Sequence, residues 1–143
     1  MVEVIDSARG LAQWLWEQFE TWQGQGHDER ERTVTGFANA HGSNTETLGR
    51  IFGENSYGKS NIWDKILGTM GKELYVRVDG SVYTDWREAL QALRRHPRAE
   101  WSPDQIHDLW RMTARNKEYV MSNMEKTMRD LGVPFCWVIT DKE

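Results

Sequence analysis

Residues 33–78 read TVTGFANAHGSNTETLGRIFGENSYGKSNIWDKILGTMGKELYVRV, and this stretch decides the fold that the sequence predicts. Phe37, Ala38 and His41 lie at helical spacing, and Gly42 follows them where a helix C-cap glycine usually stands. Further apolar residues at helical spacing are Leu48, Ile51 and Phe52, and then Ile62, Trp63, Ile66, Leu67 and Met70. The spacing therefore predicts three short helices, with a sharp turn between the first two.

The side chains at the start of the second helix are short and polar. A helix that follows such a turn is the one that enters the major groove of DNA in helix-turn-helix proteins. We expect Asn44, Thr45, Glu46 and Arg50 to face that groove. Arg50 is the best candidate to contact guanine, and Asn44 to contact adenine or a phosphate. We expect Thr47, Leu48 and Ile51, on the other side of this helix, to hold it against the core.

This part of the chain resembles the lambda-repressor-like (Cro/XRE) helix-turn-helix family over about residues 30–76. The residues that carry the resemblance are Phe37-Ala38 at the family's Leu-Ala pair, Gly42 at its turn glycine, Thr45 to Ile51 at its recognition helix, and Met70-Gly71 at its closing Leu-Gly. The resemblance implies sequence-specific binding to duplex DNA. Gly49 is unfavourable inside the second helix, because a glycine in a helix interior lowers helix stability by about 1 kcal/mol relative to alanine.

The loop GENSYGKS, residues 53–60, literally matches the GxxxxGKS pattern of phosphate-binding loops. Such a loop follows a buried strand, whereas the residues before this one, TETLGRIF, have the pattern of a helix. We therefore interpret the loop as a linker between helices. In the helix-turn-helix interpretation, Tyr57, Lys59 and Ser60 are placed to contact phosphates.

Composition limits the possible functions. Residues 1–29 hold one positive and six negative side chains, residues 30–80 seven and six, and residues 81–143 ten and ten, which gives the net charge of −4. A nearly neutral helix-turn-helix segment allows specific DNA binding but disfavours strong nonspecific affinity. The single Cys136 and the lack of a long apolar run favour a cytoplasmic protein. The four histidines have no metal-ligand spacing and no catalytic grouping stands out, so we expect no metal, no cofactor and no enzyme.

The rest of the chain predicts elements on both sides of this core. Ser7 or Asp6 can cap a first helix that runs to about Trp22, and Asp79-Gly80 is a strong signal for a β-hairpin. A short helix ending at Arg95, a long helix over residues 102–131 and a final strand are expected after it. The fold class expected is thus mainly α: a helix-turn-helix core, a hairpin and a helical C-terminal region. The domains expected are residues 1–80 for DNA binding and 81–143 for dimerisation.

These features predict a transcriptional regulator, most simply a repressor that binds its operator as a homodimer. Two half-sites would then lie about one helical turn apart. One alternative is an antitoxin that binds a toxin through its Trp- and Met-rich surfaces. Another is a phage- or plasmid-encoded inhibitor that keeps this fold and has lost DNA contact.

Overall fold

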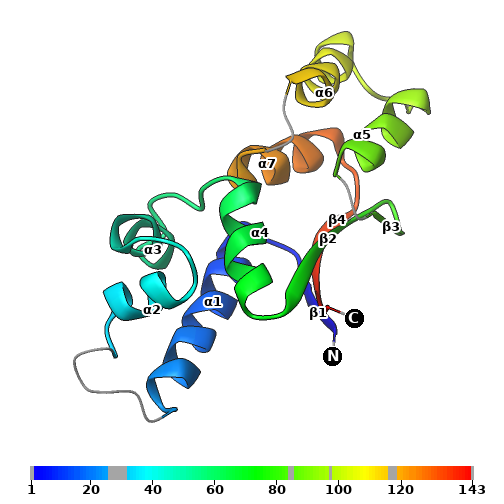
Figure 1. Ribbon diagram of the computed structural model, residues 1–143. Coiled ribbons are helices and arrows are strands. Elements are labelled where there is room, and N and C mark those ends of the chain that lie inside the picture. The colour runs from blue at the N-terminus through cyan, green and yellow to red at the C-terminus, as the bar shows by residue number, and fades with distance from the viewer. Residues whose placement is uncertain (1, 26–31, 84–85, 97, 116–118, 143) are drawn as a thin grey trace.

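The computed structural model describes residues 2–25, 32–83, 86–96, 98–115 and 119–142, and it combines helices with one sheet (Figure 1). The helices are α1 (Ala8–Gln23), α2 (Val34–Ala40), α3 (Thr45–Phe52), α4 (Ser60–Thr69), α5 (Trp86–Arg95), α6 (Pro103–Arg115) and α7 (Met121–Leu131). The strands are β1 (Val2–Ile5), β2 (Lys72–Val78), β3 (Ser81–Tyr83) and β4 (Phe135–Asp141). The three predicted helices between residues 33 and 70 are present, as is the sharp turn between α2 and α3.

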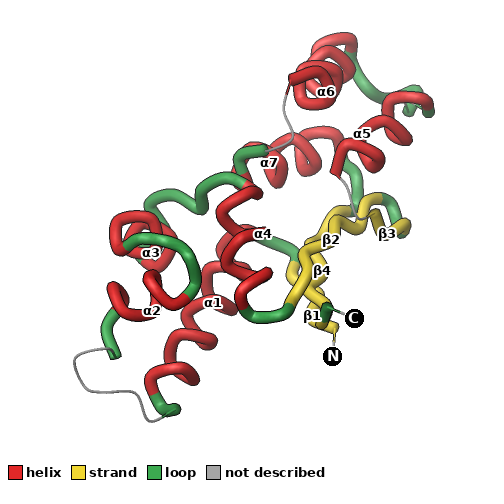
Figure 2. The backbone as a smooth tube through the Cα atoms, viewed as in Figure 1, coloured by secondary structure: helices red, strands yellow, loops and turns green. Residues whose placement is uncertain are grey.

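The expectation of a mainly α fold with a single hairpin is wrong, because the four strands form one antiparallel sheet in the order β1-β4-β2-β3 (Figure 2). The predicted hairpin is present: Val78 pairs with Ser81 around Asp79 and Gly80, which both have positive φ as a two-residue hairpin turn requires. The predicted final strand is β4, which pairs with β2 from Lys72↔Asp141 to Val78↔Phe135. The sheet is larger than expected because β1 also pairs with β4.

One face of the sheet and the helices enclose a single core. α4 and α5 pack against β2, α7 packs against β4, and α1 packs against β1. The first helix begins as predicted, since the Ser7 side chain accepts a hydrogen bond from Gly10 N–H. The apolar residues at helical spacing along this helix are buried: Leu11, Trp14, Leu15 and Phe19. Because β4 belongs to the predicted domain 81–143 and pairs with β1 and β2 of the predicted domain 1–80, the sheet spans the boundary drawn at residue 80.

The single long helix expected over residues 102–131 is also wrong, because the structure has α6 and α7 instead. Between them, Tyr119 and Val120 run alongside the loop that precedes α4. Ser60 N–H donates to the Tyr119 carbonyl at 2.8 Å, Met121 N–H donates to the Gly58 carbonyl at 3.0 Å, and Lys59 forms a β-bridge with Val120. These long-range backbone bonds, together with the burial of Tyr119, replace a continuous helix.

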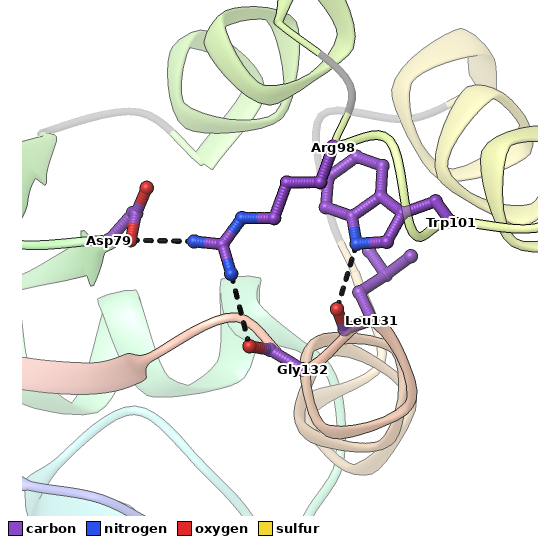
Figure 3. Close-up of polar contacts among 5 residues, drawn as sticks. All are labelled: Asp79, Arg98, Trp101, Leu131 and Gly132. Atoms are coloured by element: carbon purple, nitrogen blue, oxygen red, sulfur yellow. Dashed lines mark hydrogen bonds and ion pairs between the residues drawn. The ribbon is translucent and has the colours of Figure 1, made fainter.

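The segment between α5 and α6 is held against the hairpin and the end of α7 (Figure 3). Arg98 donates to the Asp79 carboxylate at 2.7 Å and to the Gly132 carbonyl at 3.3 Å. Trp101 is buried and donates its indole N–H to the Leu131 carbonyl at 2.8 Å. Gly132 follows the expected helix end at residue 131, and it ends α7 in the left-handed conformation.

The structure also shows where two further groups of residues lie, the methionines of α7 and the apolar residues of α5. Met121, Met124 and Met128 are buried in the core of this chain, so these α7 side chains do not form an exposed apolar surface. The short helix expected to end at Arg95 is α5, and its Ala89, Leu90 and Leu93 side chains are buried, whereas the residues 84 and 85 that could cap it lie outside the described residues. Among the described residues, no helix has the length and apolarity that crossing a bilayer requires.

Candidate nucleic-acid interface

The turn between α2 and α3 is fixed by backbone hydrogen bonds around Gly42. Ser43 N–H donates to the Ala38 carbonyl at 2.8 Å, and His41 N–H donates to the Phe37 carbonyl at 3.1 Å. Gly42 lies at φ +68°, the left-handed conformation that this helix-ending motif places on its glycine. The sequence prediction that Gly42 ends the first helix is confirmed.

α3 has one buried and one exposed face. Leu48 and Ile51 are fully buried, and with Phe37 and Ala38 of α2 they form part of the core. Thr47 is half-buried. The exposed face carries the four residues predicted to face the major groove, Asn44, Thr45, Glu46 and Arg50. All four residues predicted to face the groove are therefore exposed, and a contact between Glu46 and Arg50 places those two side chains together.

Arg50 already has a partner on its own helix. Its Nη2 atom lies 2.6 Å from Glu46 Oε1, and the two side chains are 61% and 73% exposed. A pair this exposed contributes little to stability, typically up to about 1 kcal/mol, so a stronger partner can replace Glu46. The carboxylate also holds the guanidinium near the start of α3, where a guanine edge would be read.

Asn44 and Thr45 are engaged at the first turn of α3. Asn44 Oδ1 accepts a hydrogen bond from Thr47 N–H at 2.8 Å, so this side chain is the N-cap of the helix. Its amide N–H groups are then the ones suited to a phosphate oxygen. Thr45 Oγ1 lies 2.7 Å from Thr35 Oγ1 at the start of α2. The sequence reasoning missed Thr35, because only the folded turn brings the two hydroxyls together.

Of the three residues between α3 and the start of α4 that the sequence predicted to contact phosphate, one is exposed. Lys59 is exposed at the N-terminus of α4, which has no side-chain cap. Ser60 is only 4% exposed, and its hydroxyl accepts the Tyr119 N–H at 3.0 Å. Its predicted contact with phosphate is therefore wrong, since the hydroxyl is buried and bonded within the chain.

Tyr57 is half-buried, and its carbonyl accepts the Trp63 indole N–H at 2.7 Å. Burial, and then the nearby Glu54 carboxylate, raise the pKa of the Tyr57 hydroxyl, which remains a hydrogen-bond donor at neutral pH. The acidic neighbour makes this hydroxyl a poorer phosphate contact than Lys59. The loop itself follows a helix, so the interpretation as a linker between helices holds.

A second surface feature lies between α1 and the end of α3. An open groove of about 470 Å³ has Trp16 and Phe52 among its lining residues and Glu17, Glu20 and Glu54 as its acidic groups. Trp16 is 42% exposed and packs edge-on against Phe52, with ring centroids 5.0 Å apart. A partial signal was present in the sequence, because Trp16 falls beside the buried stripe of α1 rather than within it.

Among the described residues, no three His, Cys, Asp or Glu side chains are grouped closely enough to hold a metal ion. Cys136 is half-buried in β4, and burial raises the pKa of its thiol. The exposed face of α3 carries the residues predicted to face the groove, and Lys59 is exposed at the start of α4, where it bridges to Val120. Comparison of the chain with family models, curated proteins and solved structures gave no match.

Proposed function

We propose that this chain is a cytoplasmic, sequence-specific DNA-binding regulator that inserts the exposed face of α3 into the major groove. The observation that carries the proposal is the pairing of a glycine-closed turn with a helix whose inner face is buried and whose outer face is polar. The same arrangement underlies the resemblance of residues 30–76 to the lambda-repressor-like family. Repression through a homodimer is the simplest mode of action for such a protein.

The proposed contacts divide into two kinds. Arg50 reads a guanine, and Thr45 and Glu46 lie beside it for neighbouring base edges, with a carboxylate able to accept from a cytosine amino group. Asn44 and Lys59 bind phosphates and set the register of the helix in the groove. Ser60 is not included, because it is buried.

The test is selection of binding sites from random duplex DNA, followed by affinity measurements with Arg50→Ala. We expect an enriched two-fold-symmetric site, and a loss of about 1–3 kcal/mol of specific affinity in the variant. Arg129→Ala is the matched control, since Arg129 is an exposed arginine on α7 with the same i,i+4 spacing to a glutamate, Glu125. The absence of any enriched sequence, or equal losses in both variants, would contradict the proposal.

The groove beside Trp16 favours a second candidate function, that of an antitoxin or inhibitor that binds a protein. Aromatic side chains surrounded by carboxylates suit a basic partner segment, through cation–π contact and ion pairing. Affinity purification with the wild-type chain and with Trp16→Ala separates the two functions. A partner lost with Trp16→Ala but kept with Arg50→Ala supports this candidate, and a partner insensitive to both excludes the groove.

A further inference from the structure

The sheet has a second face that the core does not use. Residues paired across antiparallel strands share a face, so the register defines the members of each face. We call the face that the core does not use the outer face. It consists of three rows across the strands: Val2, Thr140 and Glu73; Val4, Val138 and Tyr75; and Cys136, Arg77 and Val82.

The open part of the outer face is apolar and lies at the ends of its three rows. Val2, Val4 and Val82 are 60%, 53% and 54% exposed, and they are three of the four large hydrophobic residues exposed in the described part of the chain. Val138 is 3% exposed but lies outside the contiguous core, which takes Trp137 and Ile139 from the opposite face of the same strand. The described helices therefore pack against the inner face, and Figure 1 shows them to the left of the sheet and above it.

The charges of the outer face are arranged in a self-complementary way. Glu73 lies in the first row and Arg77 in the third, and the apolar middle row of Val4, Val138 and Tyr75 separates them. The Tyr75 hydroxyl donates to the Glu73 carboxylate, which holds that carboxylate on this face. A half-turn about an axis along the middle row exchanges the first and third rows.

We propose that the outer face binds a second copy of this chain, sheet against sheet, with a two-fold axis along the middle row. Each Glu73 then meets Arg77 of the second copy, while Val4, Val138 and Tyr75 meet their own counterparts. An interface of this kind is isologous, and packed antiparallel sheets are a standard way to cover such faces. Charge complementarity identifies the occupant, because the half-turn brings Glu73 of each copy opposite Arg77 of the other, while the Asp6 carboxylate also acts on Cys136 in the third row.

This inference rests on the proposed function in one respect: the proposed regulator acts as a homodimer, and this face would form it. The structural basis of the inference is the sheet alone. It also relocates the interface, because the sequence prediction placed dimerisation in the helical region after residue 80. In Figure 1, α1 and α4 lie between the sheet and the α2–α3 pair. One copy can therefore use the outer face and α3 at the same time.

The test is sedimentation velocity over a series of protein concentrations, without DNA. We expect the wild type to dimerise, and Glu73→Arg or Arg77→Glu alone to raise the dissociation constant at least about tenfold, because each variant places like charges opposite each other twice. An equimolar mixture of the two variants should dimerise again, since each side chain of one variant then faces the opposite charge of the other across the interface. Lys126→Glu on the exposed face of α7 is the control and should dimerise as the wild type does.

The mixing experiment separates repulsion from misfolding, because two misfolded variants would not restore each other. A wild type that stays monomeric at every concentration would overturn the proposal. So would charge variants that dimerise normally, or a mixture that fails to recover. A protein that failed here would still select a DNA sequence through α3 if the proposed DNA contacts are right, so a failure of this interface and a failure of sequence-specific DNA binding are distinguishable.

Discussion

Two glycines of the helix-turn-helix segment, Gly49 and Gly42, are in opposite physical situations. A Cβ added to Gly49 meets no atom within 4 Å, and the residue lies inside α3 with ordinary helical dihedrals. Gly42 has φ +68°, and its added Cβ would lie 3.0 Å from the Lys65 Cε atom. We expect Gly49→Ala to raise the free energy of unfolding by up to about 1 kcal/mol and Gly42→Ala to lower it by about 1 kcal/mol or more.

Urea unfolding of both variants against the wild type measures these changes. If Gly49→Ala destabilised the protein, α3 would not be the continuous, solvent-exposed helix described above. If Gly42→Ala had no effect, the turn would not need its left-handed residue. Sequence reasoning identified both positions, but only the structure shows that the space beside Gly49 is open.

A pH dependence of stability is expected from His41, the residue at the end of α2. Its ring packs edge-on against Phe37 at 4.5 Å, and its Nδ1 atom lies 2.8 Å from Thr69 Oγ1. Burial lowers the pKa of His41 below its ordinary value of 6.5. The unfolded chain therefore binds a proton more readily than the folded one, and stability falls as the pH drops through about 6.5 toward the folded pKa.

The measurement is the urea midpoint at about pH 7.5 and about pH 5.5, on either side of the histidine titration, for wild type and His41→Asn. The variant should lose less stability on acidification, because it lacks the group that titrates. Equal losses in the two proteins would show that His41 does not contribute.

At the scale of elements, the loop before α4 and the start of α7 hold each other through Ser60. Its hydroxyl accepts the Tyr119 N–H at 3.0 Å in a buried position, and the Tyr119 hydroxyl accepts the Trp137 indole N–H at 3.1 Å. Ser60→Ala leaves the Tyr119 N–H without that acceptor, so we expect a loss of about 1–3 kcal/mol in the free energy of unfolding. DNA affinity of the folded protein should not change, because the Ser60 hydroxyl is buried and makes none of the proposed DNA contacts.

Ser56→Ala is the control, because Ser56 lies in the same loop, is exposed and accepts only a 3.3 Å bond from Gly58 N–H. Its effect should stay within about 0.5 kcal/mol. Chemical denaturation followed by tryptophan fluorescence gives both values. Comparable losses in the two variants would contradict the role assigned to Ser60.

The elements that sequence reasoning predicted are those specified locally. α1 has a capping serine and a clear apolar stripe, the hairpin has Asp79-Gly80, and the α2–α3 turn has Gly42. β1 has only four residues and depends on pairing with β4 at the other end of the sequence, so no local pattern reveals it. The break between α6 and α7 likewise depends on a distant partner, Ser60. The helical spacing of apolar residues within 102–131 therefore could not predict where the helix is interrupted.

At the scale of the whole molecule, the candidate site was more predictable than the fold around it. Glu46 and Arg50 are i,i+4 neighbours on one short helix, so their shared exposure follows from helical geometry, and Asn44 and Thr45 are exposed at the start of that helix. Ser60 was misassigned because its burial depends on Tyr119, a residue far along the chain. The outer face of the sheet could not be predicted either, since it takes residues from all four strands.

The central place of β4 affects how the protein is made. β4 lies between β1 and β2 in the sheet, and it is the last of the four strands to leave the ribosome. Until residues 135–141 emerge, β1 has no neighbour in the described sheet, and Leu74 and Val76 of β2 lack their pairing partners Ile139 and Trp137. The segment from α1 to α4 can pack earlier, since it depends on contacts closer in sequence. A nascent chain therefore carries a formed helical half and an open apolar hairpin, which is the form that chaperones would meet during synthesis.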